Sequence, residues 1–158
     1  MSIPTMKLAT FLAADKIVLN FHADGQKETL EMLSAPLIKA GVITSHEAFV
    51  ADLIRRESEI TTVMDNGIAI PHARSNAVRR IGLTVGIAKG DGIQFGPDEG
   101  VLSRLFFCIA VPAYAPTAHI PLLQLVAQFS RDPKRVEKLL KSKTPSVASR
   151  YLGNFRGH

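Results

Sequence analysis

The chain has 158 residues, of which 46% are hydrophobic and 21% charged. This length and composition exclude a disordered chain and fit one domain over residues 1–158, large enough to form its own core. No segment reaches the roughly 20 consecutive apolar residues of a membrane-spanning helix, so we expect no membrane insertion and a cytoplasmic location.

Positive charge is concentrated near the C-terminus. The net charge is +5, and residues 131–158 hold eight of the 19 Lys and Arg but only Asp132 and Glu137 among the acids, a local charge of +6. Such a tail could bind nucleic acid, an acidic protein or anionic lipid. A solvated helix face explains the excess of positive charge equally well. Because only Tyr151 and Phe155 interleave with the charges, we expect no stable binding of nucleic acid.

Helices and strands are predicted to alternate in the first half of the chain. Apolar residues recur at helical spacing over residues 26–40, where Pro36 should bend or interrupt the helix and Gly41 should end it. Thr44 and Glu47 have the spacing of a capping box for the next helix. The other predicted elements are a short helix over residues 7–13, a strand over 16–21, a helix over 45–59, a strand over 60–64, a turn at Asn66-Gly67 and an extended segment over 68–70.

The second half adds two apolar strands and three helices. Residues 81–88 and 102–111 are predicted strands, separated by a glycine-rich loop. Helices are predicted over residues 118–130, over residues 132–142 with Asp132 as the cap, and from Pro145 onward. Intermixed helices and strands favour an α/β fold in which a sheet is sandwiched between helices.

The sequence offers little for metal or hydrolytic chemistry. Cys108 is the only cysteine and lies in the apolar run LFFCIAV, so we predict a buried thiol and no disulfide within the chain. A zinc site is disfavoured because the sequence has no His-x-x-x-His motif and no cysteine pair. It also lacks the Gly-x-Ser-x-Gly motif of many hydrolases.

Two of the five histidines remain as candidates for chemistry. His72 follows Pro71, which lacks an amide proton and is predicted to end a strand, so the imidazole should lie at a strand end on the rim of the sheet. His119 precedes Pro121, which fits only the first turn of a helix, so His119 should lie at a helix N-terminus, where anions are favoured. The others lie in a polar turn, at a helix start and at the chain end: His22, His46 and His158.

A pair of histidines without further metal ligands suits phosphoryl transfer. Neutral imidazole is nucleophilic at about pH 7, and the phosphorus–nitrogen bond that it forms stays reactive enough to pass the group onward. Cations and hydrogen-bond donors would then surround the phosphoryl oxygens. Neither histidine is a site by itself, and composition does not say that the two meet.

The stretch RESEITTVMDNGIAIPHAR, together with AHIPLLQLVAQFS, resembles the enzyme IIA domains of the phosphoenolpyruvate-dependent phosphotransferase system, in particular the fructose/mannitol group and its nitrogen-regulatory relative. The resemblance covers nearly the whole chain, and NGIAIPH is its most specific part. It implies a mixed sheet between helices, receipt of a phosphoryl group from the histidine carrier protein, and no metal or organic cofactor.

The resemblance also implies roles for individual residues. His72 would accept the phosphoryl group, and His119 would hydrogen-bond that group or orient the first ring. Arg56 would neutralise the transferring group, with Arg55 as the competing candidate.

Hydroxyl groups and one carboxylate near the site complete the expectation. Thr61 and Thr62 fall where the family places hydroxyls, so they would donate hydrogen bonds to phosphate oxygens. Family members usually have glycine in place of Asp65. A carboxylate facing the phosphorylated ring would repel the phosphate. Alternatively, Asp65 orients a histidine ring or only occupies the turn.

Three functions remain open. The leading one is a phosphocarrier in a nitrogen-regulatory role, because no cysteine-bearing transfer domain is fused to the chain, and phosphorylation would change which target proteins dock. The second is a sugar-specific transport component that passes the phosphoryl group to a IIB cysteine. The third is a regulatory binding module that keeps the fold but is not phosphorylated.

Overall fold

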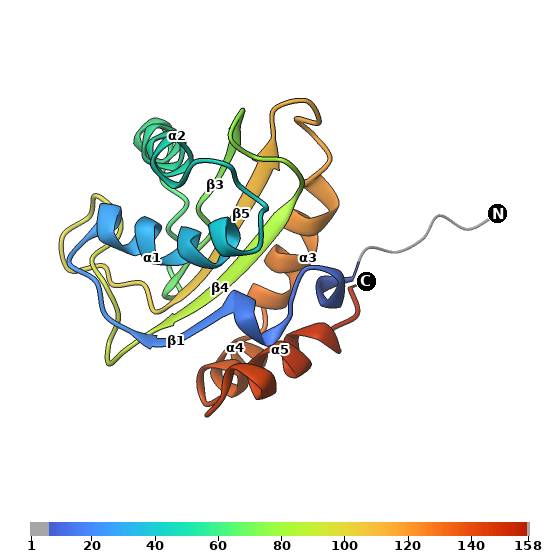
Figure 1. Cartoon of the computed structure of the whole chain (residues 1–158). Coiled ribbons are helices and arrows are strands. Elements are labelled where there is room, and N and C mark those ends of the chain that lie inside the picture. The colour runs from blue at the N-terminus through green and yellow to red at the C-terminus, as the bar shows by residue number, and fades with distance from the viewer. Residues whose placement is uncertain (1–6, 158) are drawn as a thin grey trace.

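A five-stranded sheet and two layers of helices make up the computed structural model, which describes residues 7–157 (Figure 1). The strands are β1 (Ile17–Phe21), β2 (Ile68–Ala69), β3 (His72–Ser75), β4 (Gly82–Ala88) and β5 (Leu105–Pro112), and the helices are α1 (Gln26–Lys39), α2 (His46–Glu59), α3 (Ile120–Ser130), α4 (Pro133–Leu140) and α5 (Pro145–Gly153). Helices α1 and α2 cover one face of the sheet, and α3, α4 and α5 cover the other. The predicted α/β arrangement is confirmed.

The sheet is mixed, and β5 lies near its centre. On one side, β5 pairs antiparallel with β4, which in turn pairs parallel with β1. On the other side, β2 and β3 follow one another and both run parallel to β5. His72 is therefore the partner of Ile109, only a few residues before the chain leaves β5 for the loop that leads to α3.

Side chains along β5 alternate between two buried clusters, because both faces of this strand are covered. Burial raises the pKa of the Cys108 thiol to about 12. The thiol therefore stays protonated and packs as an apolar group, and the predicted buried cysteine is confirmed. The side chains that face α3, α4 and α5 are Leu105, Phe107, Ile109 and Val111. Those that face α1 and α2 are Phe106, Cys108 and Ala110.

Glycine on β4 lets α1 approach the sheet closely. A Cβ atom at Gly86 would lie 2.4 Å from Leu33 Cδ2 and 2.9 Å from Phe21 Cε1. Such distances leave no room for a methyl group unless the helix or the ring moves.

The Gly86→Ala variant is accordingly expected to lose about 1–3 kcal/mol in its free energy of unfolding, the usual effect of overpacking a core. Urea unfolding measures this loss. In a Leu33→Ala background, where the crowding methyl groups are absent, the same substitution should destabilise less. Equal losses in both backgrounds would show that Leu33 does not press on Gly86.

The ends of α1 and α2 differ from prediction in detail. Helix α1 runs through Pro36 without interruption. It stops just before Gly41, whose φ of 74° lies outside the helical region, as predicted. Ser45 caps α2, because its hydroxyl accepts a hydrogen bond from the Ala48 amide at 3.1 Å. The Thr44 hydroxyl donates instead to a carbonyl in the loop before β4, so the predicted capping box is wrong by one residue.

Two short segments predicted as regular elements are largely irregular. In residues 60–64 only Val63 forms a β-bridge, with Ala69. The Thr62 amide donates to the Glu57 carboxylate at 3.0 Å and is not paired with a strand. A β-branched sequence favours extended backbone, but a strand also needs a neighbour. The predicted helix over residues 7–13 is reduced to one 3₁₀ turn, Leu8–Thr10.

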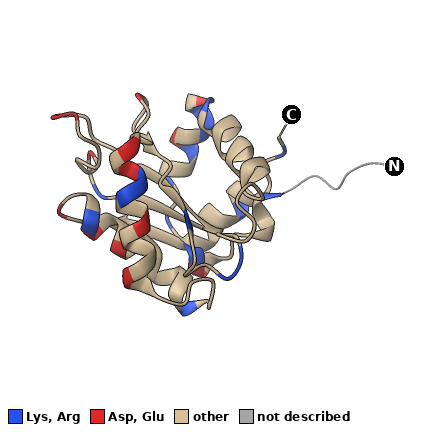
Figure 2. Ribbon diagram, turned by 90° about the horizontal axis from the view of Figure 1, so that it is seen from above, with Lys and Arg blue, Asp and Glu red and all other residues tan. Residues whose placement is uncertain are grey.

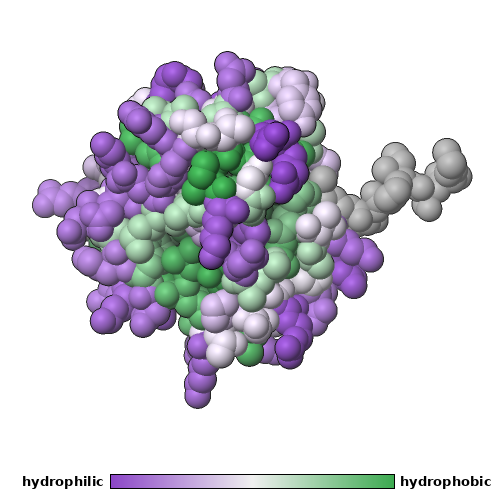
Figure 3. All heavy atoms as spheres, viewed as in Figure 1, coloured by the Kyte–Doolittle hydropathy of each residue, from purple (hydrophilic) through white to green (hydrophobic). Residues whose placement is uncertain are grey.

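The surface of the molecule is polar around its rim. On the face shown in Figure 3, hydrophilic side chains (purple) project outward, and hydrophobic residues (green) are visible between them. None of the helices in residues 7–157 combines the length and apolar character that crossing a membrane requires.

Candidate functional site

A cavity of about 360 Å³ opens where the C-terminal half of α2, strand β3 and the N-terminus of α3 come together. It lies at the rim of the sheet, beside the point where β5 ends at Val111 and Pro112. The charged and imidazole side chains that line it are Asp52, Arg55, Arg56 and Glu59 from α2, His72 and Arg74 from β3, and His119.

The structure brings together His72 and His119, which are far apart in the sequence. The ring centroids are 5.9 Å apart, and the ring planes are inclined by 36°. His119 is the N-cap residue of α3, the position expected from Pro121 in the first turn. The two imidazoles and the arginines of α2 thus face one anion-sized space.

His72 begins a strand, whereas the sequence predicted that the strand would end at Pro71. The Pro71 carbonyl accepts a hydrogen bond from the Ile109 amide at 2.9 Å, and β3 then pairs with β5 from His72 to Ser75. Proline removes only a donor, so it separates β2 from β3 without ending the pairing along β5. The strand before Pro71 therefore does end, as predicted, at Ala69, and His72 lies at the cavity, but the new strand β3 that begins at His72 was not predicted.

The backbone selects the tautomer of the neutral His72 ring. Its Nδ1 lies 2.7 Å from the carbonyl oxygen of Ile70. A carbonyl oxygen only accepts, so Nδ1 carries the proton and donates it. In the neutral ring, Nε2 then keeps its lone pair, and within residues 7–157 it makes no hydrogen bond. Nε2 is thus the nucleophilic nitrogen of this ring.

The His119 ring has a nitrogen that the folded chain does not satisfy. Its Nδ1 is buried and has no hydrogen-bond partner among the described residues. His119 as a whole residue is 7% exposed, and although it is the N-cap residue of α3, its side chain makes no capping hydrogen bond. A buried polar atom without a partner costs about 1–3 kcal/mol. His119 is therefore a residue that gains from contact with a group outside the chain.

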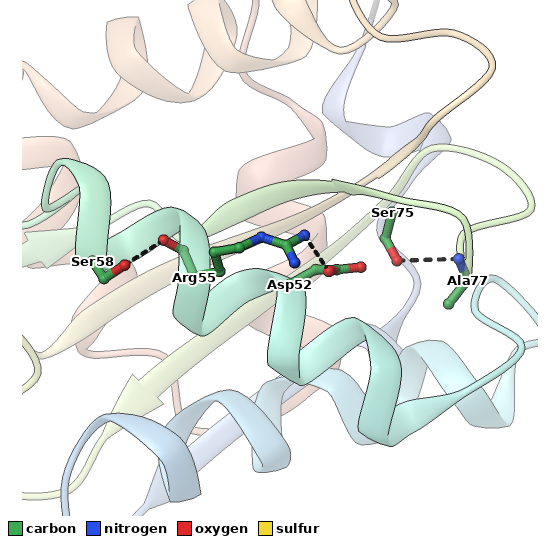
Figure 4. A network of polar contacts seen from close by, with 5 residues as sticks. All are labelled: Asp52, Arg55, Ser58, Ser75 and Ala77. Carbon is green, nitrogen blue, oxygen red and sulfur yellow. Dashed lines mark hydrogen bonds and ion pairs between the residues drawn. The ribbon is translucent and has the colours of Figure 1, made fainter.

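The two candidate arginines differ in their partners. Arg56 donates from Nη1 to the carbonyl of Ile60 at 2.8 Å, using one of the five N–H groups of its guanidinium. Arg55 lies along α2 and pairs with Asp52 at 2.5 Å, as Figure 4 shows. Of these two arginines, Arg56 and not Arg55 lowers the pKa of His72, so the structure favours Arg56 as the α2 cation that acts on that ring.

The predicted hydroxyl groups lie elsewhere. The Thr62 hydroxyl donates a hydrogen bond to the Glu57 carboxylate, and Glu57 is almost fully buried. The same carboxylate accepts a hydrogen bond from the Thr62 amide. The Thr61 hydroxyl accepts from the amide of Val63 at 3.2 Å. Neither threonine lines the cavity, so the structure does not bring them to the two histidines. Asp65 is exposed and does not line it either.

Three charged residues of the cavity were not predicted. Arg74 lies two residues after His72, and the two-residue period of a strand places both on one face. Asp52 and Glu59 lie four residues before and three residues after Arg56, so helical spacing places all three on one side of α2. Both signals are present in the sequence: the helical spacing follows from the predicted helix over residues 45–59, whereas the position of Arg74 becomes readable only once β3 is known to be a strand.

Both imidazoles are kept neutral by their surroundings. Burial lowers the pKa of His72, the hydrogen bond to Ile70 opposes this change, and the Arg56 charge adds to it. Burial also lowers the pKa of His119, and the neighbouring His72 and Arg74 act in the same direction. A neutral pair is the form in which one ring can act as a nucleophile.

Acidification is therefore expected to destabilise the folded protein through these rings. The unfolded chain has the ordinary histidine pKa of 6.5 and takes up protons that the folded chain does not. The free energy of unfolding should fall as the pH drops through about 6.5 and level off below the lowered pKa values. In urea unfolding, His72→Gln/His119→Gln should show a smaller fall between about pH 7 and about pH 5. An unchanged fall would contradict the lowered pKa values.

Residues 10–154 match the family model described as phosphoenolpyruvate-dependent sugar phosphotransferase system, EIIA 2. The chain belongs to this family.

Among the residues described, no group of three or more His, Cys, Asp and Glu side chains is placed to hold a metal ion.

Curated relatives of this EIIA 2 chain have sugar-specific names. It is 29% identical over 146 residues to the PTS system fructose-specific EIIA component of Haloferax volcanii, covering 92% of this chain and 94% of that protein. It is 27% identical over 139 residues to the fructose-specific EIIABC component of Bacillus subtilis, covering 88% of this chain. The match spans only 22% of that longer protein.

Solved structures share the fold. The nitrogen regulatory protein IIA-Ntr of Neisseria meningitidis superposes with a TM-score of 0.79 at 24% identity, covering 92% of this chain and 98% of that one. IIA mannitol of Escherichia coli, solved in complex with phosphorylated IIB mannitol, gives a TM-score of 0.77 at 22% identity, covering 91% and 98%. The expected mixed sheet and the family resemblance are thus confirmed.

Proposed function

We propose that this EIIA 2 chain is a phosphocarrier that accepts a phosphoryl group on Nε2 of His72. The observation that carries the proposal is the hydrogen bond from Nδ1 to Ile70, which leaves Nε2 as the lone-pair nitrogen beside His119. In the transfer, Nε2 forms a bond to phosphorus while the bond between phosphorus and the donor's imidazole nitrogen breaks. The electron pair of that bond returns to the donor ring.

The neighbouring side chains suit the charge of the group that would be transferred. A phosphoryl group brings up to two negative charges, and Arg56 and Arg74 lie in the same cavity as His72. The unsatisfied His119 ring can reorganise to hydrogen-bond a phosphoryl oxygen. Arg55 contributes less in this arrangement because Asp52 already compensates its charge.

The donor is the histidine carrier protein, and exposed apolar residues beside the cavity support docking of such a protein. Ile60, whose carbonyl binds Arg56, is 70% exposed, and Ile120, next to His119, is 43% exposed. Exposed apolar side chains around a polar centre are typical of surfaces that contact other proteins. A partner seated there would also exclude water from the cavity.

A sugar-specific role is favoured over the nitrogen-regulatory role that the sequence alone suggested. The curated relatives are named for fructose and mannitol, whereas the nitrogen-regulatory name belongs to a structural neighbour at 24% identity. One relative combines EIIA, EIIB and EIIC in its name, and one neighbour was solved with IIB. We therefore assign a IIB component as the acceptor from His72. The nitrogen-regulatory role remains the second candidate.

A phosphoryl-transfer assay tests the proposal. The chain is incubated with phosphoenolpyruvate and the purified upstream carriers, and its intact mass is then measured. An acid-labile adduct of one phosphoryl group is expected, together with its rapid loss when a fructose- or mannitol-type IIB component is added. An adduct that no IIB removes would favour the regulatory role. No adduct at all would leave a binding module that is not phosphorylated.

A further inference from the structure

A second cavity, of about 510 Å³, lies at the opposite end of α3 from His119. Phe129 contributes to it from the last turn of α3, ten residues and about 15 Å along the helix axis from His119. The remaining lining comes from α4, α5 and the segment after α5. This cavity therefore shares no residue with the site of His72.

The charge of this second cavity is entirely positive. Arg135, Lys138 and Arg156 line it, and no acidic residue does so within the described chain. Arg135 approaches Asp132 only to 3.8 Å, and Asp132 also caps α4 through the Lys134 amide. The cavity lies in the segment that carries +6 of charge. In Figure 2 most acidic residues (red) lie on the side of the molecule away from the labelled chain ends.

Aromatic rings hold two of these cations in place. The guanidinium carbon of Arg135 lies 4.7 Å from the ring centroid of Phe155, and the Lys138 ammonium lies 5.1 Å from that of Tyr151. Both rings pack edge-on against Phe129, at 5.4 Å and 6.1 Å between centroids. Because Phe129 is 1% exposed, this aromatic base is anchored in the core. The cationic groups consequently lose little freedom when an anion binds.

We propose that this cavity binds a small organic phosphate. Three cations line the cavity, and only Arg135 has an acidic neighbour, Asp132 at 3.8 Å outside the lining, so the cavity matches a phosphate dianion, and the Asn154 amide can hydrogen-bond the rest of the ligand. The volume lies within the range of about 300–1,000 Å³ of small-molecule sites. Stacking of nucleic acid bases is disfavoured in this cavity. Phe129 and Phe155 are buried, and a cation lies over the ring of Phe155 and another over the ring of Tyr151.

Isothermal titration of the whole chain with glucose 6-phosphate tests the inference without any phosphorylation of His72. We expect saturable binding of one molecule per chain, with a dissociation constant between about 10 μM and about 1 mM. Glucose, which lacks the charge, should not bind. In Arg135→Gln/Lys138→Gln the dissociation constant should rise at least about tenfold. Lys138→Gln alone should weaken binding in the same direction, and circular dichroism checks that both variants fold.

Lys141→Gln is the matched control, because Lys141 lies next to α4 but pairs with Glu137 outside the cavity. Its dissociation constant should change less than about twofold. Equal weakening in Lys141→Gln would overturn the inference, since it would show a general charge effect. Binding of phosphatidylglycerol vesicles or duplex DNA without saturable binding of glucose 6-phosphate would overturn it as well. These outcomes are independent of whether His72 accepts a phosphoryl group.

Discussion

The His72→Ala protein is expected to remain at its unmodified mass under conditions that label the wild type fully. Among the histidines of residues 7–157, the substitution removes the only imidazole whose Nε2 is left unprotonated by a hydrogen bond to the backbone. The fold should persist, because His72 is half-buried at the start of β3 and the strand is held by main-chain pairing with β5. Intact-mass measurement after incubation with phosphoenolpyruvate and the upstream carriers gives the readout.

His119→Ala is the informative companion, because it removes the second ring and leaves the acceptor in place. It should still acquire the acid-labile adduct, at a reduced rate. A label that persists in His72→Ala and disappears in His119→Ala would assign the acceptor to the other histidine. Urea unfolding of both variants separates a loss of chemistry from a loss of folded protein.

Arg56→Ala is expected to slow phosphorylation by about 10²–10³-fold, the usual effect of removing one donor that stabilises developing charge. Arg56 is the arginine of α2 whose charge acts on His72, and it is fixed by the Ile60 carbonyl at 2.8 Å. Stability should change little, because Arg56 is only partly buried and its hydrogen bond to the Ile60 carbonyl lies at the surface. Stopped-time mass measurements give the two rates.

Arg55→Ala provides the control from the neighbouring position on the same helix. The Arg55 side chain is 70% exposed and its guanidinium is paired with Asp52, so its removal should slow the transfer less than about fivefold. If Arg55→Ala is slower than Arg56→Ala, the assignment of Arg56 is wrong and the Asp52 pair does not neutralise Arg55 in the complex with the donor.

The elements that the sequence predicts well are those with strong apolar periodicity. The continuous burial along β5 and the apolar face of α2 follow directly from patterns in the chain, and the bounds of both elements differ from prediction by only a few residues. Residues 60–64 show the limit of such patterns. Their β-branched side chains favour an extended backbone, but whether a second strand is there to pair with it is decided by tertiary structure.

The site was accessible from the sequence only in part. Pro71 and Pro121 indicate the local positions of His72 and His119, but no periodicity states that the two rings lie 5.9 Å apart. Arg74 was missed because Pro71 was interpreted as the end of a strand. Thr62 was assigned to phosphate, whereas its amide and hydroxyl both bind the Glu57 carboxylate, a contact that depends on how the chain turns after α2.

The contact between the His72 ring and the Ile70 carbonyl has a bearing on how freely the rest of the cavity can vary. The acceptor of that hydrogen bond belongs to the main chain, so no exchange of a neighbouring side chain can delete it. Relatives could therefore alter the arginines and carboxylates around the ring, and with them the choice of partner, while the tautomer stays the same. Mutational robustness of the reactive nitrogen is built into the peptide unit two residues upstream.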